Sequence, residues 1–124
     1  MSRTVLIVED AEICRDTLEI ALMKVPNLAV RSVTTAEEAL QWLAANQVSV
    51  LVTDIRLPRM DGFALIEAVR SRCSNLPIVV ISGDSDPRLP AHVAGLGVSA
   101  YFPKPYSPTE LLHKLEELIG ASAA

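Results

Sequence analysis

The sequence has 124 residues, of which half are hydrophobic, 4% are aromatic and 21% are charged. A chain of this length fits one domain (1–124), and we expect an aliphatic core over residues 4–119. The formal net charge of -4 argues against a domain that binds nucleic acid by neutralising phosphates. No apolar run approaches the roughly 20 residues that cross a bilayer, and no segment resembles a signal peptide. We therefore expect a cytoplasmic protein without membrane contact.

Strands and helices alternate along the predicted secondary structure. We expect strands at 4–9, 28–33, 48–53, 77–81 and 99–102, and helices at about 11–24, 35–45, 62–71, 88–96 and 108–119. The strand segments are continuous apolar runs, which are typical of strands buried on both faces. Five such units predict a doubly wound α/β fold, in which five helices cover the two faces of a five-stranded parallel sheet.

Several helix ends carry recognisable signals. Thr35 followed by Glu38 predicts the start of the second helix. Gly97 and Gly120 predict the ends of the fourth and fifth helices. Prolines and glycines crowd the fourth helix, so we expect it to be short and the least rigid element.

Polar side chains follow four of the predicted strands. Glu9 and Asp10 end the first apolar run, Asp54 the third, Ser82 the fourth, and Lys104 follows the fifth. The carboxyl ends of parallel strands meet at one edge of a sheet, where ligands bind in such folds. We therefore expect three acids, a hydroxyl and a lysine to converge there.

This set of residues suits a cation and a phosphoryl group. Close carboxylates repel unless a cation lies between them, and oxygen ligands favour Mg²⁺. A carboxylate such as Asp54 can attack phosphorus to form an acyl phosphate, while Lys104 and Ser82 stabilise the transferred oxygens. The sequence contains no Gly-rich phosphate loop, which disfavours nucleotide binding.

Each residue also has a simpler interpretation. Glu9 and Asp10 fit a helix cap, Asp54 and Ser82 fit turns, and Lys104 fits a solvated position. The shared position of all five at strand ends favours a functional site. Cys14 and Cys73 lack metal-ligand spacing and are predicted to be free thiols.

With these residues in view, the chain resembles the receiver domain of two-component response regulators, of the chemotaxis-regulator type. The resemblance extends from Val5 to Leu118. It rests on Glu9-Asp10, Asp54 followed by Leu57-Pro58 and Asp61-Gly62, Ser82-Gly83, and Tyr101 before Lys104-Pro105. It implies a flavodoxin-like sheet with strand order 2-1-3-4-5.

The resemblance also implies roles for the site. Asp54 would accept a phosphoryl group from the phosphohistidine of a sensor histidine kinase or phosphotransfer protein, and Lys104 would pair with it. The peptide bond before Pro105 would be cis. Mg²⁺ would be held by Glu9, Asp10, Asp54 and the backbone carbonyl of Arg56. Glu9 stands where the family more often has aspartate, and its longer arm would reach the cation through water.

By the same resemblance, Ser82 and Tyr101 form a switch. Ser82 would move toward the phosphoryl group and the ring of Tyr101 would turn inward. This movement would alter the face made by the fourth helix, fifth strand and fifth helix, which would control an unknown output protein or domain or a phosphorylation-dependent homodimer. Arg56 and Asp84 are predicted to face each other across the site mouth, either as modulators of dephosphorylation or as a surface ion pair of little consequence.

The sequence thus predicts a phosphorylation-controlled switch that acts on itself and is not an enzyme for an external substrate. One alternative is a pseudo-receiver, an interaction module that no longer cycles phosphate. Another is a small flavodoxin-like cofactor binder or phosphohydrolase, which the scarcity of aromatic residues disfavours. Whether the chain acts alone, or as one domain of a larger regulator or hybrid kinase, stays open.

Overall fold

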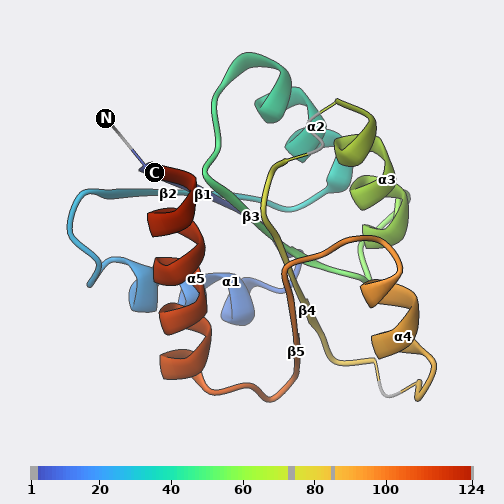
Figure 1. Cartoon of the computed structure of the whole chain (residues 1–124). Helices are drawn as coiled ribbons and strands as arrows, with labels where there is room; N and C mark the ends of the chain where they lie inside the picture. The colour runs from blue at the N-terminus through green and yellow to red at the C-terminus, as the bar shows by residue number, and fades with distance from the viewer. Residues whose placement is uncertain (1–2, 73–74, 85, 124) are drawn as a thin grey trace.

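The computed structural model describes residues 3–72, 75–84 and 86–123, which alternate between strand and helix (Figure 1). The strands are β1 (Arg3–Val8), β2 (Leu28–Val33), β3 (Val50–Asp54), β4 (Ile78–Ser82) and β5 (Ala100–Pro103). The helices are α1 (Glu12–Leu22), α2 (Ala36–Ala45), α3 (Gly62–Arg72), α4 (Leu89–Ala94) and α5 (Pro108–Ala123). Each element predicted from the sequence is present, and the differences lie at element ends.

The strands form one parallel sheet in the order β2-β1-β3-β4-β5, which confirms the predicted fold and strand order. The register pairs Val8 with Thr53 and Asp54 with Ile81. Glu9, which follows β1, and Ser82, the last residue of β4, therefore lie at the same edge of the sheet as Asp54. This edge at β1 and β3 is also the point where the strand order reverses, the usual ligand-binding place in open α/β sheets.

Both faces of the three central strands β1, β3 and β4 are buried, as their continuous apolar runs predict, whereas the edge strands β2 and β5 are partly exposed. Successive side chains of a strand point to opposite faces. Leu6 and Val8 of β1 therefore belong to the core under α2, α3 and α4, whereas Val5 and Ile7 belong to the core under α1 and α5. Figure 1 shows these two groups of helices on opposite sides of the sheet. Each buried side chain of this size stabilises the fold by about 1.5–3 kcal/mol.

A glycine was predicted to end each of the last two helices, α4 and α5, and the outcomes differ. Gly97 has a φ of 73° and follows α4, but the helix ends at Ala94 with Gly95 as its C-cap, slightly before the predicted end. The prediction that Gly120 ends α5 is wrong, because the helix continues to Ala123. Glycine costs only about 1 kcal/mol relative to alanine inside a helix, and the following residues are mostly alanine.

Helix α4 has six residues, in agreement with its predicted shortness, and it carries proline in its first turn. Arg88 precedes it without a side-chain cap hydrogen bond. Such a short helix is not stable in isolation, so α4 depends on its packing through Leu89 and Val93, both of which are buried.

Two further sequence predictions concern the cysteines and membranes. Cys14 is a free thiol of intermediate exposure, and Cys73 lies outside the described residues. Within residues 3–72, 75–84 and 86–123, no helix has the length and apolar character needed to cross a membrane.

Candidate functional site

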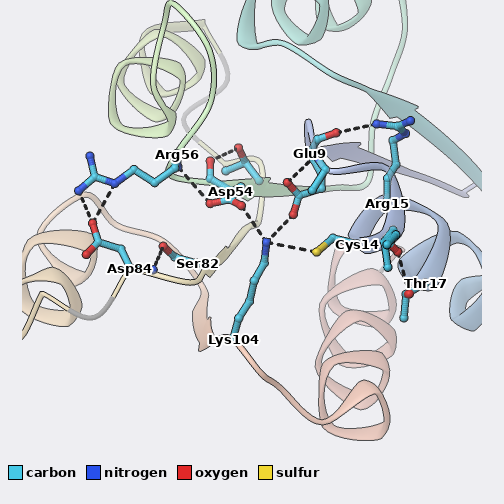
Figure 2. Close-up of polar contacts among 12 residues, drawn as sticks. Glu9, Cys14, Arg15, Thr17, Asp54, Arg56, Ser82, Asp84 and Lys104 are labelled. Atoms are coloured by element: carbon cyan, nitrogen blue, oxygen red, sulfur yellow. Dashed lines mark hydrogen bonds and ion pairs between the residues drawn. The ribbon is translucent and has the colours of Figure 1, made fainter.

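Asp54 lies at the centre of the polar cluster at the carboxyl edge of the sheet (Figure 2). It is the last residue of β3 and is 5% exposed. Its Oδ1 accepts a hydrogen bond from the Arg56 backbone N–H at 3.0 Å, and its Oδ2 accepts one from Lys104 Nζ at 2.9 Å. These donors fix the orientation of the carboxylate at the end of the strand.

Glu9 provides the second carboxylate for the same lysine. Its side chain is fully buried, its Oε1 lies 2.6 Å from Lys104 Nζ, and its Oε2 accepts the Ala11 N–H at 3.3 Å. Burial raises the pKa of Glu9, as does the charge of Asp54, although the hydrogen bond from Lys104 opposes both. Burial alone would lower the pKa of Lys104, but its hydrogen bonds to Glu9 and Asp54 raise that pKa above its usual range.

The backbone brings these three residues together from distant parts of the chain. The Lys104 N–H donates to the Ser82 carbonyl at 2.7 Å, which aligns the end of β5 with β4. The peptide bond between Lys104 and Pro105 is cis, as predicted. On the other side, the Glu9 N–H donates to the Val33 carbonyl, and Arg15 Nη1 donates to the Glu9 carbonyl, both at 3.1 Å.

Gly62 allows α3 to begin directly against the loop that follows Asp54. Its N–H donates to the Ile55 carbonyl at 2.8 Å. A Cβ at this position would lie 2.4 Å from the Asp54 carbonyl oxygen, a severe clash with backbone. The Asp61 carboxylate accepts the Ala64 N–H at 2.9 Å and so caps the same helix. Gly62 therefore supports the position of Asp54, whereas Asp61 caps α3.

The predicted switch residues occupy neighbouring positions on β4 and β5. Ser82 is fully buried, and its Oγ accepts the Asp84 N–H at 3.1 Å. Tyr101 pairs in register with Val80 and packs partly buried against the core under α4. Burial raises the pKa of Tyr101, and the charge of Asp84 adds to the effect. The structure thus places Ser82 next to Asp84 and Tyr101 on the strand paired with β4, and the movement of both residues stays a prediction.

Arg56 and Asp84 face each other, as expected from the sequence. Arg56 Nε donates to Asp84 Oδ2 at 2.9 Å, and its Nη2 contacts the same oxygen. A second ion pair follows, in which the Arg88 guanidinium donates to both oxygens of Asp86.

Both aspartates of these ion pairs have lowered pKa values. Hydrogen bonds from the Asp86 N–H and then from Arg56 lower the pKa of Asp84. Hydrogen bonds from the Arg88 side chain and backbone lower the pKa of Asp86 to about 2. Both carboxylates are therefore ionised at neutral pH.

Asp10 does not join the hydrogen-bonded cluster. It follows Glu9 and is exposed, and within the described residues no group of three or more acids, cysteines or histidines is arranged to hold a metal ion. The chemistry of the donors nevertheless fits Mg²⁺, since carboxylate oxygens of Glu9 and Asp54 already converge on one cationic atom, Lys104 Nζ. Magnesium binding by Glu9, Asp10, Asp54 and the Arg56 carbonyl therefore stays a prediction.

Several contacts near the site were not predicted from the sequence. Lys104 Nζ lies 3.7 Å from Cys14 Sγ, because α1 starts beside Glu9. The direct Lys104–Glu9 ion pair was missed because Glu9 was assigned to a cation. The alternation of Ser82, Asp84 and Asp86 was a usable signal, since short polar side chains accept hydrogen bonds from the backbone two residues ahead.

Comparison with known proteins agrees with this geometry. The family model of the response regulator receiver domain matches residues 5–116. The transcriptional regulatory protein GltR of Pseudomonas aeruginosa is 34% identical over 119 residues, which cover 94% of this chain and 49% of GltR. The response regulator MprA of Mycobacterium ulcerans is 32% identical over 121 residues, covering 96% of this chain and 51% of MprA. The chain therefore spans about half the length of these relatives.

Solved structures show the same fold. The signal receiver domain of an HD domain-containing protein from Pseudomonas fluorescens has a TM-score of 0.91 and 25% identity, covering 99% of this chain and 98% of that one. The chemotaxis response regulator CheY4 of Vibrio cholerae has a TM-score of 0.83 and 25% identity, covering 95% of this chain and 99% of its own.

Replacing Lys104 with methionine tests the electrostatic role of the lysine. The change leaves Glu9 and Asp54 as buried carboxylates without their shared ammonium, and we expect the free energy of unfolding at neutral pH to fall by about 3 kcal/mol. The loss should shrink in mildly acidic solution, because burial already raises the pKa of Glu9 and a protonated Glu9 no longer repels Asp54.

Urea denaturation at several pH values measures this effect. The double variant Glu9→Gln/Lys104→Met serves as the control and should recover part of the lost stability. Equal stability of Lys104→Met and the parent at neutral pH would contradict the interpretation.

Proposed function

The chain belongs to the response regulator receiver family, and from that premise we propose that it is a switch controlled by phosphorylation of Asp54. The observation that carries the proposal is the placement of the Asp54 carboxylate, held between the Arg56 N–H and the Lys104 ammonium at the open edge of the sheet. Receiver domains are signalling switches, and under the proposal this one promotes only its own phosphorylation and dephosphorylation.

The proposed reaction transfers a phosphoryl group from a phosphohistidine. A carboxylate oxygen of Asp54 attacks phosphorus, a P–O bond forms, and the P–N bond breaks with its electron pair remaining on the imidazole. Lys104 balances negative charge on the phosphoryl oxygens, and the buried hydroxyl of Ser82 is available to donate to one of them. Dephosphorylation is a separate hydrolysis, in which water attacks phosphorus, the P–O bond to Asp54 breaks, and phosphate and the free carboxylate are released.

Magnesium completes the proposal. Bound Mg²⁺ supplies positive charge that stabilises the phosphoryl oxygens during transfer, and we assign Glu9, Asp10, Asp54 and the Arg56 carbonyl as the residues that hold it. The buried Glu9 carboxyl, whose pKa is raised by burial, is favoured in its ionised form when a further cation is near.

The proposed output depends on movement of the switch residues Ser82 and Tyr101. Movement of Ser82 and Tyr101 would alter the face of α4, β5 and α5, which we propose controls an output protein or domain or a homodimer in the cytoplasm. The partner that supplies the phosphoryl group would be a sensor histidine kinase or phosphotransfer protein. The alternative is a pseudo-receiver without phosphate cycling, against which the paired Asp54, Lys104 and Ser82 argue.

Phosphorylation of Asp54 is tested by intact-mass spectrometry after incubation with acetyl phosphate and Mg²⁺. We expect one phosphoryl adduct on the parent, because Asp54 is the carboxylate paired with Lys104, and no adduct on Asp54→Ala. Asp61→Ala is a matched control, since Asp61 is an exposed carboxylate that caps α3, and it should keep the adduct. An unmodified parent, or an adduct that persists in Asp54→Ala, would favour the pseudo-receiver alternative.

A protein donor must also reach the site across α1. The exposed large hydrophobic residues of the described chain are Ile13, Ile20 and Met23, all on α1 or at its end. Ile13 adjoins Cys14, whose Sγ contacts Lys104 Nζ, so this surface begins at the mouth of the site. We propose that it contacts the phosphohistidine donor.

Replacing Ile13 with aspartate tests this surface. We expect phosphotransfer from an autophosphorylated histidine kinase that labels the parent to slow by about tenfold, the effect of roughly 1.4 kcal/mol of lost binding. Labelling by acetyl phosphate should not change, because the small donor needs no docking surface. Gln41→Asp, which adds the same charge at an exposed position of α2, is the control. Equal slowing with both donors would point to damage of the site instead.

The Arg56–Asp84 ion pair is proposed to limit the access of the water that hydrolyses the acyl phosphate. We expect Arg56→Ala and Asp84→Ala each to speed dephosphorylation by about three- to fivefold, a scale set by the free energy of an exposed ion pair. The double variant should match the single variants, since each already breaks the pair. Loss of the adduct over time measures the rates, and rates equal to the parent's would reject the role.

A further inference from the structure

A continuous series of hydrogen bonds leads from Asp54 to the start of α4. The Arg56 N–H donates to Asp54 Oδ1, and the Arg56 guanidinium donates to Asp84 Oδ2. Asp84 Oδ1 then accepts the Asp86 N–H at 3.0 Å, and Asp86 Oδ1 accepts the Arg88 N–H at 2.9 Å. Figure 2 shows the first part of this series, from Asp54 through Arg56 to Asp84.

The predicted switch hydroxyl enters the same series from the sheet. Ser82 Oγ accepts the Asp84 N–H at 3.1 Å, so the Asp84 backbone is bonded to Ser82 while its side chain is bonded to Arg56. Any change in the position of Ser82 or Arg56 therefore reaches Asp84. From Asp84 the connection to α4 passes through Asp86.

Asp86 is bonded to the first residues of α4 at several points. Its carboxylate accepts the Arg88 N–H and the Arg88 guanidinium, and its carbonyl accepts the Leu89 N–H at 3.0 Å. Arg88 itself offers no side-chain cap to the helix. The bonds to Asp86 thus take over the function of a cap.

We propose that Asp86 is a positioning residue that couples the start of α4 to the phosphoacceptor site through Asp84. The proposal rests on the proposed function, because it assigns how phosphorylation of Asp54 reaches α4. An acyl phosphate replaces the free carboxylate that accepts the Arg56 N–H and adds negative charge that attracts the Arg56 guanidinium. Both changes alter the hydrogen bonds from Arg56 to Asp84. The hydrogen bond from the Asp86 N–H to Asp84 then transmits the alteration to α4.

The far end of α4 has a separate attachment. The ring of His92 stacks on that of Phe63 of α3, with centroids 4.1 Å apart and planes 13° apart. Phe63 follows Gly62, which is bonded to the loop after Asp54 but not to Asp84 or Asp86. Loss of the side-chain bonds of Asp86 should therefore make the start of α4 more mobile while its end stays attached. The test accordingly compares the start of the helix with its end.

Amide hydrogen exchange of residues 88–95, with and without acetyl phosphate and Mg²⁺, measures the coupling. In the parent we expect phosphorylation to change exchange at these amides. In Asp86→Ala the Arg88 N–H loses its side-chain acceptor, so we expect exchange at Arg88 to be about fivefold faster in both states, the scale of one net hydrogen bond, and the phosphorylation-dependent change to disappear. Asp86→Asn keeps an acceptor oxygen for the Arg88 N–H and should keep the change.

Two controls separate the outcomes. Asp61→Ala removes a matched carboxylate cap from α3 and should keep the response of α4. Intact mass of each sample reports the phosphoryl adduct independently. A missing adduct on the parent would defeat the proposed function, whereas a normal adduct on Asp86→Ala with the parent's full change at α4 would overturn the role of Asp86.

Discussion

The ion pairs of the Lys104 ammonium with Glu9 and Asp54 hold the carboxyl edge of the sheet together. Glu9 and Asp54 leave the neighbouring central strands β1 and β3, whereas Lys104 follows the edge strand β5. The contacts therefore reach over β4 and bring an edge loop back to the centre. Burial of two carboxylates is costly without a cation, so the loops that deliver Lys104 and Asp54 are constrained to keep this geometry. The clash that any Cβ at position 62 would make with the Asp54 carbonyl is one such constraint.

A buried cluster of charges contributes little to the stability of the fold, but it is well suited to a chemical reaction. Hydrophobic residues of similar size would stabilise the fold as well or better, and a charged cluster is retained where function needs it. Lys104 has two acceptors, and a phosphoryl group on Asp54 would compete with Glu9 for the same ammonium. The fully buried Glu9 is thus both a neighbour that keeps Lys104 in place and an alternative partner for it.

The sequence predicted the fold because strands such as Ile78–Ser82 are uniformly apolar until the polar residue that ends them, a pattern typical of buried parallel strands. Resemblance supplied the strand order, since apolar runs alone do not determine neighbours. Gly120 was misread because one glycine is a weak signal beside the alanines that follow it. The Glu9–Lys104 contact depends on the paths of loops, which residue spacing does not fix. The site was therefore predicted as a set of residues with the Arg56–Asp84 pair, and the pairing of Lys104 with Glu9 emerged only from the structure.

The position of α4 explains why a change at the site would be felt there before elsewhere. Strands β1, β3 and β4 are buried on both faces, so a shift among them would disturb two cores at once. Helix α4 is only six residues long, and its start is held by loop residues that are partly exposed. The energy needed to move it is small, because few buried contacts and exposed hydrogen bonds mark the least stable parts of a protein. Under the proposed function, a charge added at Asp54 would act between a tightly packed sheet and a short helix, and the helix would be the element that moves.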